Sequence, residues 1–416
     1  MKLLALLLTA LLAFSATACQ KETPPDTSME FNPETDCQYY NSKSGVYPIA
    51  ESPDGYYYIT NVENPGFIRY IDKESLQDTI LCGKPNCLHA KEDDITQCNG
   101  YIGTGRWMSI HYYNGSIYTI SKVQDPKTFG WIHQFTKISL DGSVRKAVWN
   151  LDWEHKEQFP YLHQELMHRG KLYFSVYTSV TNEKEPMELY CYDLRSKKCI
   201  PILTETQGID LIAARGDYLY YTAYNTKREY SHVYRYTLST GEITELSAYQ
   251  NVFFYSDKIL FRTKEDATKY IQTDLDGETE KEYGLSFASF YGANENYICI
   301  SRSKFFRKET GQEVTYEDYL EATTFDTTGM TQEEIFLELD KRHVKFDIVY
   351  DKENTIYDVE TLEELGKITV PSGMNVVYFE GDRFVVFEAT FGTFQTIDFS
   401  KLGTNEFQWV TSSKVN

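Results

Sequence analysis

A unit of short aromatic strands and glycine turns recurs along this chain and constrains its fold more than any other feature. The clearest copy lies at residues 215–245, where Gly216 and Gly241 each mark a tight turn beside an aromatic-rich run. The run at residues 233–238 has a period of two residues, as the side chains of a strand do. Such runs are typical of short strands, and glycine supplies the backbone angles that hairpin turns need. The recurrence therefore predicts a repeat architecture built from β-hairpins.

Seven copies of this unit can be followed along the chain. The fourth and fifth copies are separated by close to ~40 residues, the length of a four-stranded propeller blade. A sandwich would need fewer strands, and a barrel would not keep a blade-length period. The pattern predicts an all-β, seven-bladed β-propeller, with six or eight blades as alternatives, and a closing strand from the segment around residues 37–49. The copies lie at residues 53–72, 114–142, 169–194, 215–245, 257–277, 295–358 and 380–399.

The composition agrees with this fold and limits the partners. The chain contains 34 tyrosines and 24 phenylalanines, and aromatic side chains suit half-buried strands. Its formal net charge is −20. Nucleic acids and anionic lipid surfaces are bound by clustered lysine and arginine. We therefore expect no nucleic-acid partner.

The N-terminal residues have the form of an export signal. An apolar run at residues 3–14 is too short to span a bilayer comfortably, and Ala16-Thr17-Ala18-Cys19 follows it. This ending resembles the bacterial lipobox and predicts a lipoprotein signal peptide at residues 1–18 with lipidation of Cys19. The alternative is plain cleavage at an Ala-x-Ala site. Residues 19–36 are then a predicted flexible tether, and residues 37–416 are the propeller, anchored to the cell membrane on its extracellular side.

The most specific local motif lies in an insertion at residues 82–106. Cys82, Cys87, His89 and Cys98 can supply the four ligands of a closed tetrahedral zinc site. Their spacing matches none of the common zinc patterns closely, and exported proteins also form disulfides. The alternative is a disulfide between two of these cysteines, with one thiol left over. Either role is structural, because four protein ligands leave zinc no open position. No other cofactor is expected.

Two other cysteines are close enough in sequence to form a pair. Cys191 and Cys199 flank a short polar segment and are a disulfide candidate across a hairpin. Cys299 lies in an apolar strand and is expected to be a small core residue.

A second insertion, at residues 303–345, interrupts the sixth unit. Thr331 and Glu334 have the spacing of a capping box, and Ile335 and Leu339 fall on one face of the helix that would follow. We expect a short helix that packs over the edge of blade six. A lid or a partner site is the alternative.

The lipobox-like start, the aromatic repeats and the cysteine insertion together resemble uncharacterised propeller lipoproteins on the surface of Gram-positive anaerobic bacteria. That family is similar in style to the propellers of low-density-lipoprotein-receptor-like proteins, although the receptor-type Tyr-Trp-Thr-Asp motif is absent from this chain. The resemblance covers essentially the whole mature chain and implies a surface-anchored propeller. It carries over no catalytic residue.

The sequence contains no nucleophile elbow, no His-Glu-x-x-His helix and no phosphate-binding loop. We therefore assign no catalytic residue and expect a membrane-anchored extracellular binding or scaffold protein, with a protein, peptide or glycan ligand on its loops. One alternative is a surface hydrolase or lyase acting on polysaccharide or peptide, which would need histidines and carboxylates clustered near the axis. Another is an accessory subunit of an envelope or transport complex, which would expose a large apolar patch.

Overall fold

The computed structural model describes most of the chain between residues 27 and 414. No helix in this described part is long and apolar enough to cross a membrane. Cys19 and the predicted signal peptide lie outside it, because residues 1–26 and 415–416 are not described. Within the range, the residues that the structure does not describe are 39–40, 43–48, 61–65, 90–93, 104–108, 125–130, 152–160, 178–186, 207, 225–230, 248, 256, 264–268, 285–287, 308–309, 316–324, 327–329, 332–333, 336, 339–340, 342–347, 371–375 and 389–392.

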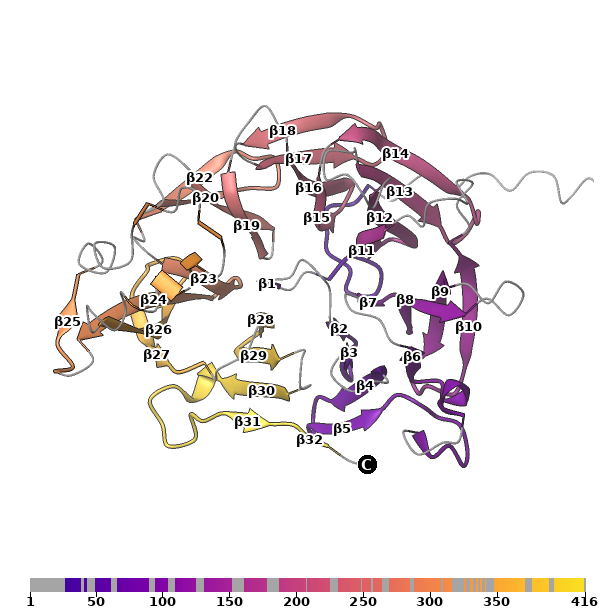
Figure 1. Ribbon diagram of the computed structural model, residues 1–416, viewed down its shortest axis with the longest axis horizontal. Helices are drawn as coiled ribbons and strands as arrows, with labels where there is room; N and C mark the ends of the chain where they lie inside the picture. The colour runs from indigo at the N-terminus through magenta and orange to yellow at the C-terminus, as the bar shows by residue number, and fades with distance from the viewer. Residues whose placement is uncertain are drawn as a thin grey trace, which may run out of the picture.

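Seven antiparallel sheets surround a central axis and form the blades of a β-propeller (Figure 1). The four main strands of each blade follow chain order from the axis outwards. The first four blades are built from β2 (Ile49–Glu51), β3 (Gly55–Ile59), β4 (Gly66–Asp72) and β5 (Gln77–Ile80); β7 (Ile110–Tyr112), β8 (Ser116–Gln124), β9 (Trp131–Ser139) and β10 (Arg145–Asn150); β11 (Tyr161–His168), β12 (Lys171–Tyr177), β13 (Met187–Asp193) and β14 (Cys199–Thr206); and β15 (Ile209–Arg215), β16 (Tyr218–Tyr224), β17 (Ser231–Thr237) and β18 (Ile243–Ser247).

The last three blades follow the same plan. They are built from β19 (Tyr249–Tyr255), β20 (Lys258–Thr263), β21 (Lys269–Thr273) and β22 (Thr279–Gly284); β23 (Ala288–Ala293), β24 (Tyr297–Arg307), β26 (Ile348–Asp358) and β27 (Glu364–Ile368); and β28 (Val376–Glu380), β29 (Arg383–Glu388), β30 (Thr393–Asp398) and β31 (Val410–Thr411). Short additional elements are β1 (Asn41–Ser42), β6 (Tyr101–Gly103), β25 (Glu313–Val314), β32 (Ser413–Lys414) and the 3-10 helices η2 (Ile95–Gln97) and η3 (Phe399–Lys401).

This architecture confirms the predicted all-β, seven-bladed propeller. Each sequence unit contains the two middle strands of one blade. In blade four, β16 and β17 pair without interruption from Tyr218 opposite Thr237 to Tyr224 opposite Ser231. The turn before β16 contains Gly216 at φ 55°, a conformation that residues with a side chain adopt only with strain. The repeated glycine turns therefore mark the hairpins that set the blade period.

Aromatic side chains fill the spaces between blades. Tyr220 of β16 is fully buried between blades four and five, and its ring centroid lies 4.8 Å from that of Phe254. Its hydroxyl donates a hydrogen bond to the carbonyl of Leu275 at 2.9 Å. A buried tyrosine thus combines a large apolar contact with a satisfied polar group. Blade packing accounts for side chains of this kind in the tyrosine-rich composition.

Strands from both ends of the described chain close the ring. β1 pairs with β28, the first main strand of blade seven, which confirms the predicted closing strand from the segment around residues 37–49. β32 pairs in parallel with β5, the outer strand of blade one, a contact that the sequence did not predict. Blade one and blade seven are therefore joined to each other through both chain ends.

A packed segment precedes β1. Residues 28–38, which we call the N-terminal strap, run against the blades, and the carboxylate of Asp36 is fully buried there. Its partner is Arg169 in the turn between β11 and β12, with Nε of Arg169 at 2.7 Å from Oδ1 of Asp36. The described part of the predicted tether at residues 19–36 therefore includes a stretch that is bonded to the propeller.

The second insertion begins as an extension of blade six. β24 and β26 are both 11 residues long and remain paired as far as Arg307 opposite Ile348, so strand structure continues into the predicted range of 303–345. Thr331 and Glu334 make the reciprocal hydrogen bonds of a capping box at 2.8–3.3 Å. The structure does not show the helix itself, since many of the residues that would form it lie outside the described part. That helix stays a prediction.

A buried carboxyl group lies on β11, the innermost main strand of blade three. Glu165 is 1% exposed and accepts a hydrogen bond from the N–H of Ser109 at 3.0 Å. Removal from water disfavours the charged form of a carboxyl group. Burial accordingly raises the pKa of Glu165 from its ordinary 4.5 to about 7. Ionisation of this side chain therefore opposes folding.

We predict that Glu165→Gln makes the propeller more stable at pH 8 and changes little at pH 4. Glu165 titrates near 4.5 when unfolded and at about 7 when folded, so the folded chain binds more protons between these values. Its contribution to stability is lost as the pH rises through this window and stays lost above it. Denaturant titration at pH 8 should show a free energy of unfolding higher by up to about 3 kcal/mol in the variant. The same pH dependence in both proteins would contradict the raised pKa.

Candidate functional site

The cysteine insertion leaves the propeller at the outer edge of blade one. β5 and β6 pair with successive parts of β4, and residues 81–100 form an excursion between them. Ile68 of β4 holds both ends of this excursion. Its carbonyl accepts a hydrogen bond from the N–H of Leu81 at 2.9 Å, and its own N–H donates to the carbonyl of Gly100 at 2.8 Å. The two ends of the excursion are therefore fixed next to each other.

The excursion also packs against blade two. Asn99 donates hydrogen bonds from Nδ2 to the carbonyls of Gly142 and Ser143, at 2.8 and 3.0 Å, in the turn between β9 and β10. A Cβ added to Gly142 would lie 2.7 Å from the backbone nitrogen of Cys82, closer than real Cβ contacts allow. Only glycine permits this approach. The excursion thus bridges the first two blades.

The four predicted ligands meet inside the excursion. The ligand atoms of Cys82, Cys87, His89 and Cys98 all lie within 4.8 Å of one another. Sγ of Cys98 is 3.8 Å from Nδ1 of His89. Tetrahedral zinc with bonds of about 2.3 Å to sulfur places its sulfur ligands about 3.8 Å apart. The side chains would therefore need only small movements to surround a zinc ion.

Two residues in left-handed backbone conformation allow this short loop to fold back on itself. Asn86 has φ 63° and His89 has φ 56°. Asparagine adopts this conformation readily, whereas a histidine there costs of order 1 kcal/mol or more. A bound metal would offset that cost by using the ring of His89 as a ligand.

The thiols of the cluster are electrostatically coupled. Burial acts to raise the pKa of Cys82, but the N–H groups of Lys84 and Asn99, together with the neighbouring thiols, lower the pKa below its ordinary 9. At Cys98, burial and the charge of the nearby Cys82 raise the pKa to about 12. One thiolate therefore opposes the formation of a second beside it. A divalent cation would remove this opposition, because thiolates are the form that binds metal.

The predicted disulfide between Cys191 and Cys199 is absent from the structure. Cys199 lies opposite Tyr192 in the β13–β14 register, so the side chains of Cys191 and Cys199 point to opposite faces of the sheet. They pack in different cores, one on each side of the blade. Cys299 is fully buried in the core, as expected. No described cysteine forms a disulfide; these residues are Cys37, Cys82, Cys87, Cys98, Cys191, Cys199 and Cys299.

A histidine and a carboxylate lie side by side on two innermost main strands. Nε2 of His163 on β11 is 2.7 Å from Oδ1 of Asp210 on β15, and the Asp210 side chain is 55% exposed. Such a pair can orient a histidine as a general base. Because 47 residues separate His163 from Asp210 in the chain, the sequence alone does not bring them together. Only the contact between neighbouring blades reveals the pair.

A polar groove lies between blades seven and one. Its volume is about 640 Å³. Nζ of Lys73 is paired with Glu51 at 2.5 Å, and the Tyr297 hydroxyl donates to Asp382 at 2.8 Å, so some of the lining charges have fixed partners. Two cations and three carboxylates thus lie close together beside solvent. The lining residues are Lys73, Glu74, Gly381, Asp382, Arg383, Asp398 and Ser400.

No protein-family model matches the chain, and no curated protein matches its sequence. Solved propeller structures do match its fold. A puromycin-hydrolyzing peptidase from Mycobacterium tuberculosis is 8% identical with a TM-score of 0.51, over 94% of this chain and 56% of the peptidase. This chain therefore spans little more than half the length of that peptidase.

Two further solved structures are more distant. The β-propeller domain of the Trilobed protease from Pyrococcus furiosus is 12% identical with a TM-score of 0.42, over 73% of this chain and 84% of that domain. A chain of a nidogen–laminin complex is 10% identical with a TM-score of 0.34, over 57% of this chain and 79% of that one. At these identities the likeness shows the propeller fold alone.

We predict that the purified protein binds one zinc ion and that Cys98→Ser abolishes binding, because zinc then loses one of four ligands. Cys199→Ser is the matched control, since it removes a half-buried thiol outside the cluster. Metal content would be measured by mass spectrometry, and thermal unfolding with and without a chelator. Loss of a clamp worth about 2 kcal/mol should lower the Tm of the wild type and the control by roughly 2–3 °C in a chain of this length. Metal-free wild-type protein with fewer free thiols than cysteines would instead support a disulfide.

Proposed function

We propose that this chain is a cell-surface binding protein whose propeller holds a peptide segment of a partner. The observation that carries the proposal is the charged groove between blades seven and one. Lys73 and Arg383 offer cations within the same groove as the carboxylates of Glu74, Asp382 and Asp398. A peptide with charged side chains of both signs and a polar main chain complements such a groove. An uncharged glycan would complement these charged groups less well.

The cluster of Cys82, Cys87, His89 and Cys98 is consistent with a binding protein. Its four protein donors would complete the coordination of zinc and leave no position for a substrate. The excursion would then fix the outer edge of blade one, which also lines the groove, to blade two. Zinc in this role would make the surface rigid. A rigid, preorganised site binds a peptide at a lower entropic cost.

A lipid on Cys19 would place this binding protein at the membrane. The support is in the sequence, where Ala16-Thr17-Ala18-Cys19 follows an apolar run. A single diacylated cysteine supplies two acyl chains, which is enough for stable anchoring. The proposal therefore describes a binding protein that remains attached to the cell that exports it.

The second candidate is a peptide hydrolase. It is favoured by the pair of His163 and Asp210 at the axis, which could activate a nucleophile or a water molecule. Two of the solved propellers that the chain resembles in fold are named as a peptidase and a protease, which is consistent with this candidate. Among the described residues, no serine, threonine or cysteine side chain is hydrogen-bonded to this pair. We therefore rank this candidate second.

We predict that peptides selected from a random 12-residue display library on the wild-type protein lose at least tenfold in affinity for Glu74→Lys and Arg383→Glu. Each substitution reverses a charge in the groove and places like charge against a bound peptide. Lys146→Glu on β10 is the control, because it also reverses an exposed charge but lies outside the groove. Calorimetry would measure affinity, and mass spectrometry would show whether the peptide stays intact. Binding unchanged in both groove variants would refute the proposed site, and cleavage abolished by His163→Ala would support the hydrolase.

We predict that Cys19→Ala moves the protein from the membrane fraction to the soluble exported fraction. Without the thiol no diacylglycerol can be attached, and the described part has no other apolar span. Cys199→Ser should stay with the membrane, and mass spectrometry of the mature N-terminus should find the lipid in that control. Membrane retention of Cys19→Ala would contradict the lipid anchor.

A further inference from the structure

The N-terminal strap contacts blades two, three and four before the chain reaches β1. Gly216 of blade four lies against Met29, where an added Cβ would come within 2.2 Å of the Met29 sulfur. Nearby, the guanidinium of Arg215 stacks over the ring of Phe31 at 4.3 Å. Further along, the hydroxyl of Tyr112 in blade two donates to Glu34 at 2.6 Å. The strap is thus attached at several points along its length.

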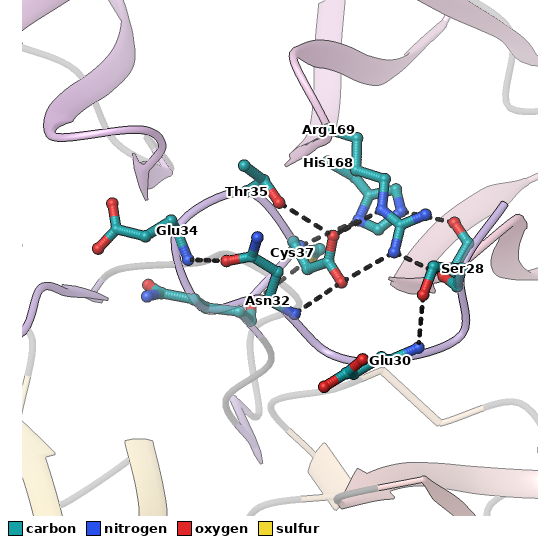
Figure 2. Close-up of polar contacts among 11 residues, drawn as sticks. Ser28, Glu30, Asn32, Glu34, Thr35, Cys37, His168 and Arg169 are labelled. Atoms are coloured by element: carbon teal, nitrogen blue, oxygen red, sulfur yellow. Dashed lines mark hydrogen bonds and ion pairs between the residues drawn. The ribbon is translucent and has the colours of Figure 1, made fainter. Parts of the chain in front are cut away.

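Blade three provides the central attachment of the strap (Figure 2). Arg169 donates from Nε and Nη2 to the two carboxylate oxygens of Asp36, at 2.7 and 3.2 Å, and from Nη2 to the carbonyl of Ser28 at 2.7 Å. The backbone N–H of Arg169 also donates to the carbonyl of Thr35 at 2.7 Å. A buried carboxylate and a fork of guanidinium donors form a strong, directional contact. One arginine therefore bonds both ends of the strap segment.

His168 strengthens the same attachment without carrying charge. The N–H of Cys37 donates to Nδ1 of His168 at 3.1 Å, which leaves Nε2 to donate to the carbonyl of Gly216 at 2.8 Å. Full burial lowers the pKa of His168 to about 4, so the ring is neutral near pH 7. The strap and blade four are therefore joined through one imidazole across a wide range of pH.

All of these attachment points lie on one face of the propeller. Gly216, Arg169 and Asn114, whose N–H donates to the carbonyl of Glu34 at 2.6 Å, belong to turns that join the first and second strands of their blades. In an antiparallel blade, the turn from the third to the fourth strand returns to this same face, and the other connections lie on the opposite one. We call the side with these turns the strap face.

The charged groove opens on the strap face. Lys73 and Glu74 belong to the turn between β4 and β5, which joins the third and fourth strands of blade one. Gly381 and Asp382 belong to the turn between β28 and β29, which joins the first and second strands of blade seven. The strap and the groove therefore share one surface.

We propose that the strap turns this face toward the membrane, so that the groove receives a membrane-proximal segment of another membrane protein. The inference rests on the lipid anchor proposed for Cys19. Ser28 follows Cys19 by nine residues, which extend at most about 32 Å. A blade strand of seven residues is about 23 Å long, so the opposite face lies farther from the anchor by about that distance. The covalent link to a fixed strap therefore favours placing the strap face nearer the bilayer.

The partner follows from this placement. A ligand between the strap face and the bilayer must be polar and must carry both signs of charge to match the groove. It must also reach within about 32 Å of the bilayer. The extracellular segment that adjoins a transmembrane helix of a neighbouring protein meets all three conditions. A ligand that arrives from the surrounding medium would more readily meet the opposite face.

Energy transfer to a labelled bilayer tests the orientation independently of native lipidation. A chain that starts at residue 20 behind ten histidines would be bound to vesicles through nickel-chelating lipids, with acceptor dye on other headgroups. A donor dye would be attached through an azido amino acid at Glu278, in the β21–β22 turn of the strap face, or at Asn150, exposed at the opposite end of β10. Energy transfer should be several-fold stronger from position 278 than from position 150.

The double variant Asp36→Asn with Arg169→Met removes the central attachment, with asparagine keeping the shape of Asp36 and methionine keeping an unbranched side chain at position 169. It should reduce the difference between the two labels toward equality while the circular dichroism spectrum stays unchanged. Equal transfer, or stronger transfer from position 150, in the unmodified strap would overturn the orientation. Lipidation is tested separately by Cys19→Ala, so failure of the anchor and failure of the orientation give different results.

Discussion

The packing of blade seven against blade one decides whether this chain is a closed ring. Tyr56 and Tyr58 of β3 meet Phe394 and Phe387 of blade seven, with ring centroids 4.7 and 4.8 Å apart. The Tyr58 hydroxyl donates to the buried carboxylate of Asp78 at 2.6 Å, and Asp78 is also paired with a buried arginine. Every other blade packs against the blades before and after it in the chain, whereas blades one and seven are the two ends of that series and meet across this seam, which β1 and β32 also span. Burial of these apolar side chains between blades one and seven therefore closes the ring of blades.

The other distinctive features gather around the same seam. β1 and β32 add strands to blades seven and one, the groove lies between these blades, and the cysteine excursion leaves from the outer edge of blade one. These segments are far apart in sequence. Blade one therefore takes part in the seam, in the groove and in the excursion.

Local rules predicted what depends on neighbouring residues. Each blade hairpin is a turn and its two flanking strands, and the four cluster ligands lie within one short loop, so both could be read from spacing. The face of the sheet on which a side chain lies was harder to predict. Cys191 and Cys199 are close in sequence, but the register of the hairpin places them on opposite faces. His163 with Asp210 and Asp36 with Arg169 join distant residues. Their positions follow from blade-to-blade packing, which no single segment encodes.

The parallel pairing of β32 with β5 gives the chain a definite order of completion. β5 ends at Ile80, but its outer partner starts only at Ser413. In a chain that emerges N-terminus first, the strands of all seven blades emerge before β32 can pair with β5. During that time the outer edge of the first blade has no β32 to cover it, and the excursion folded beside it is the nearest protection against pairing with another chain. The sheet that is made first is therefore the one that is finished last.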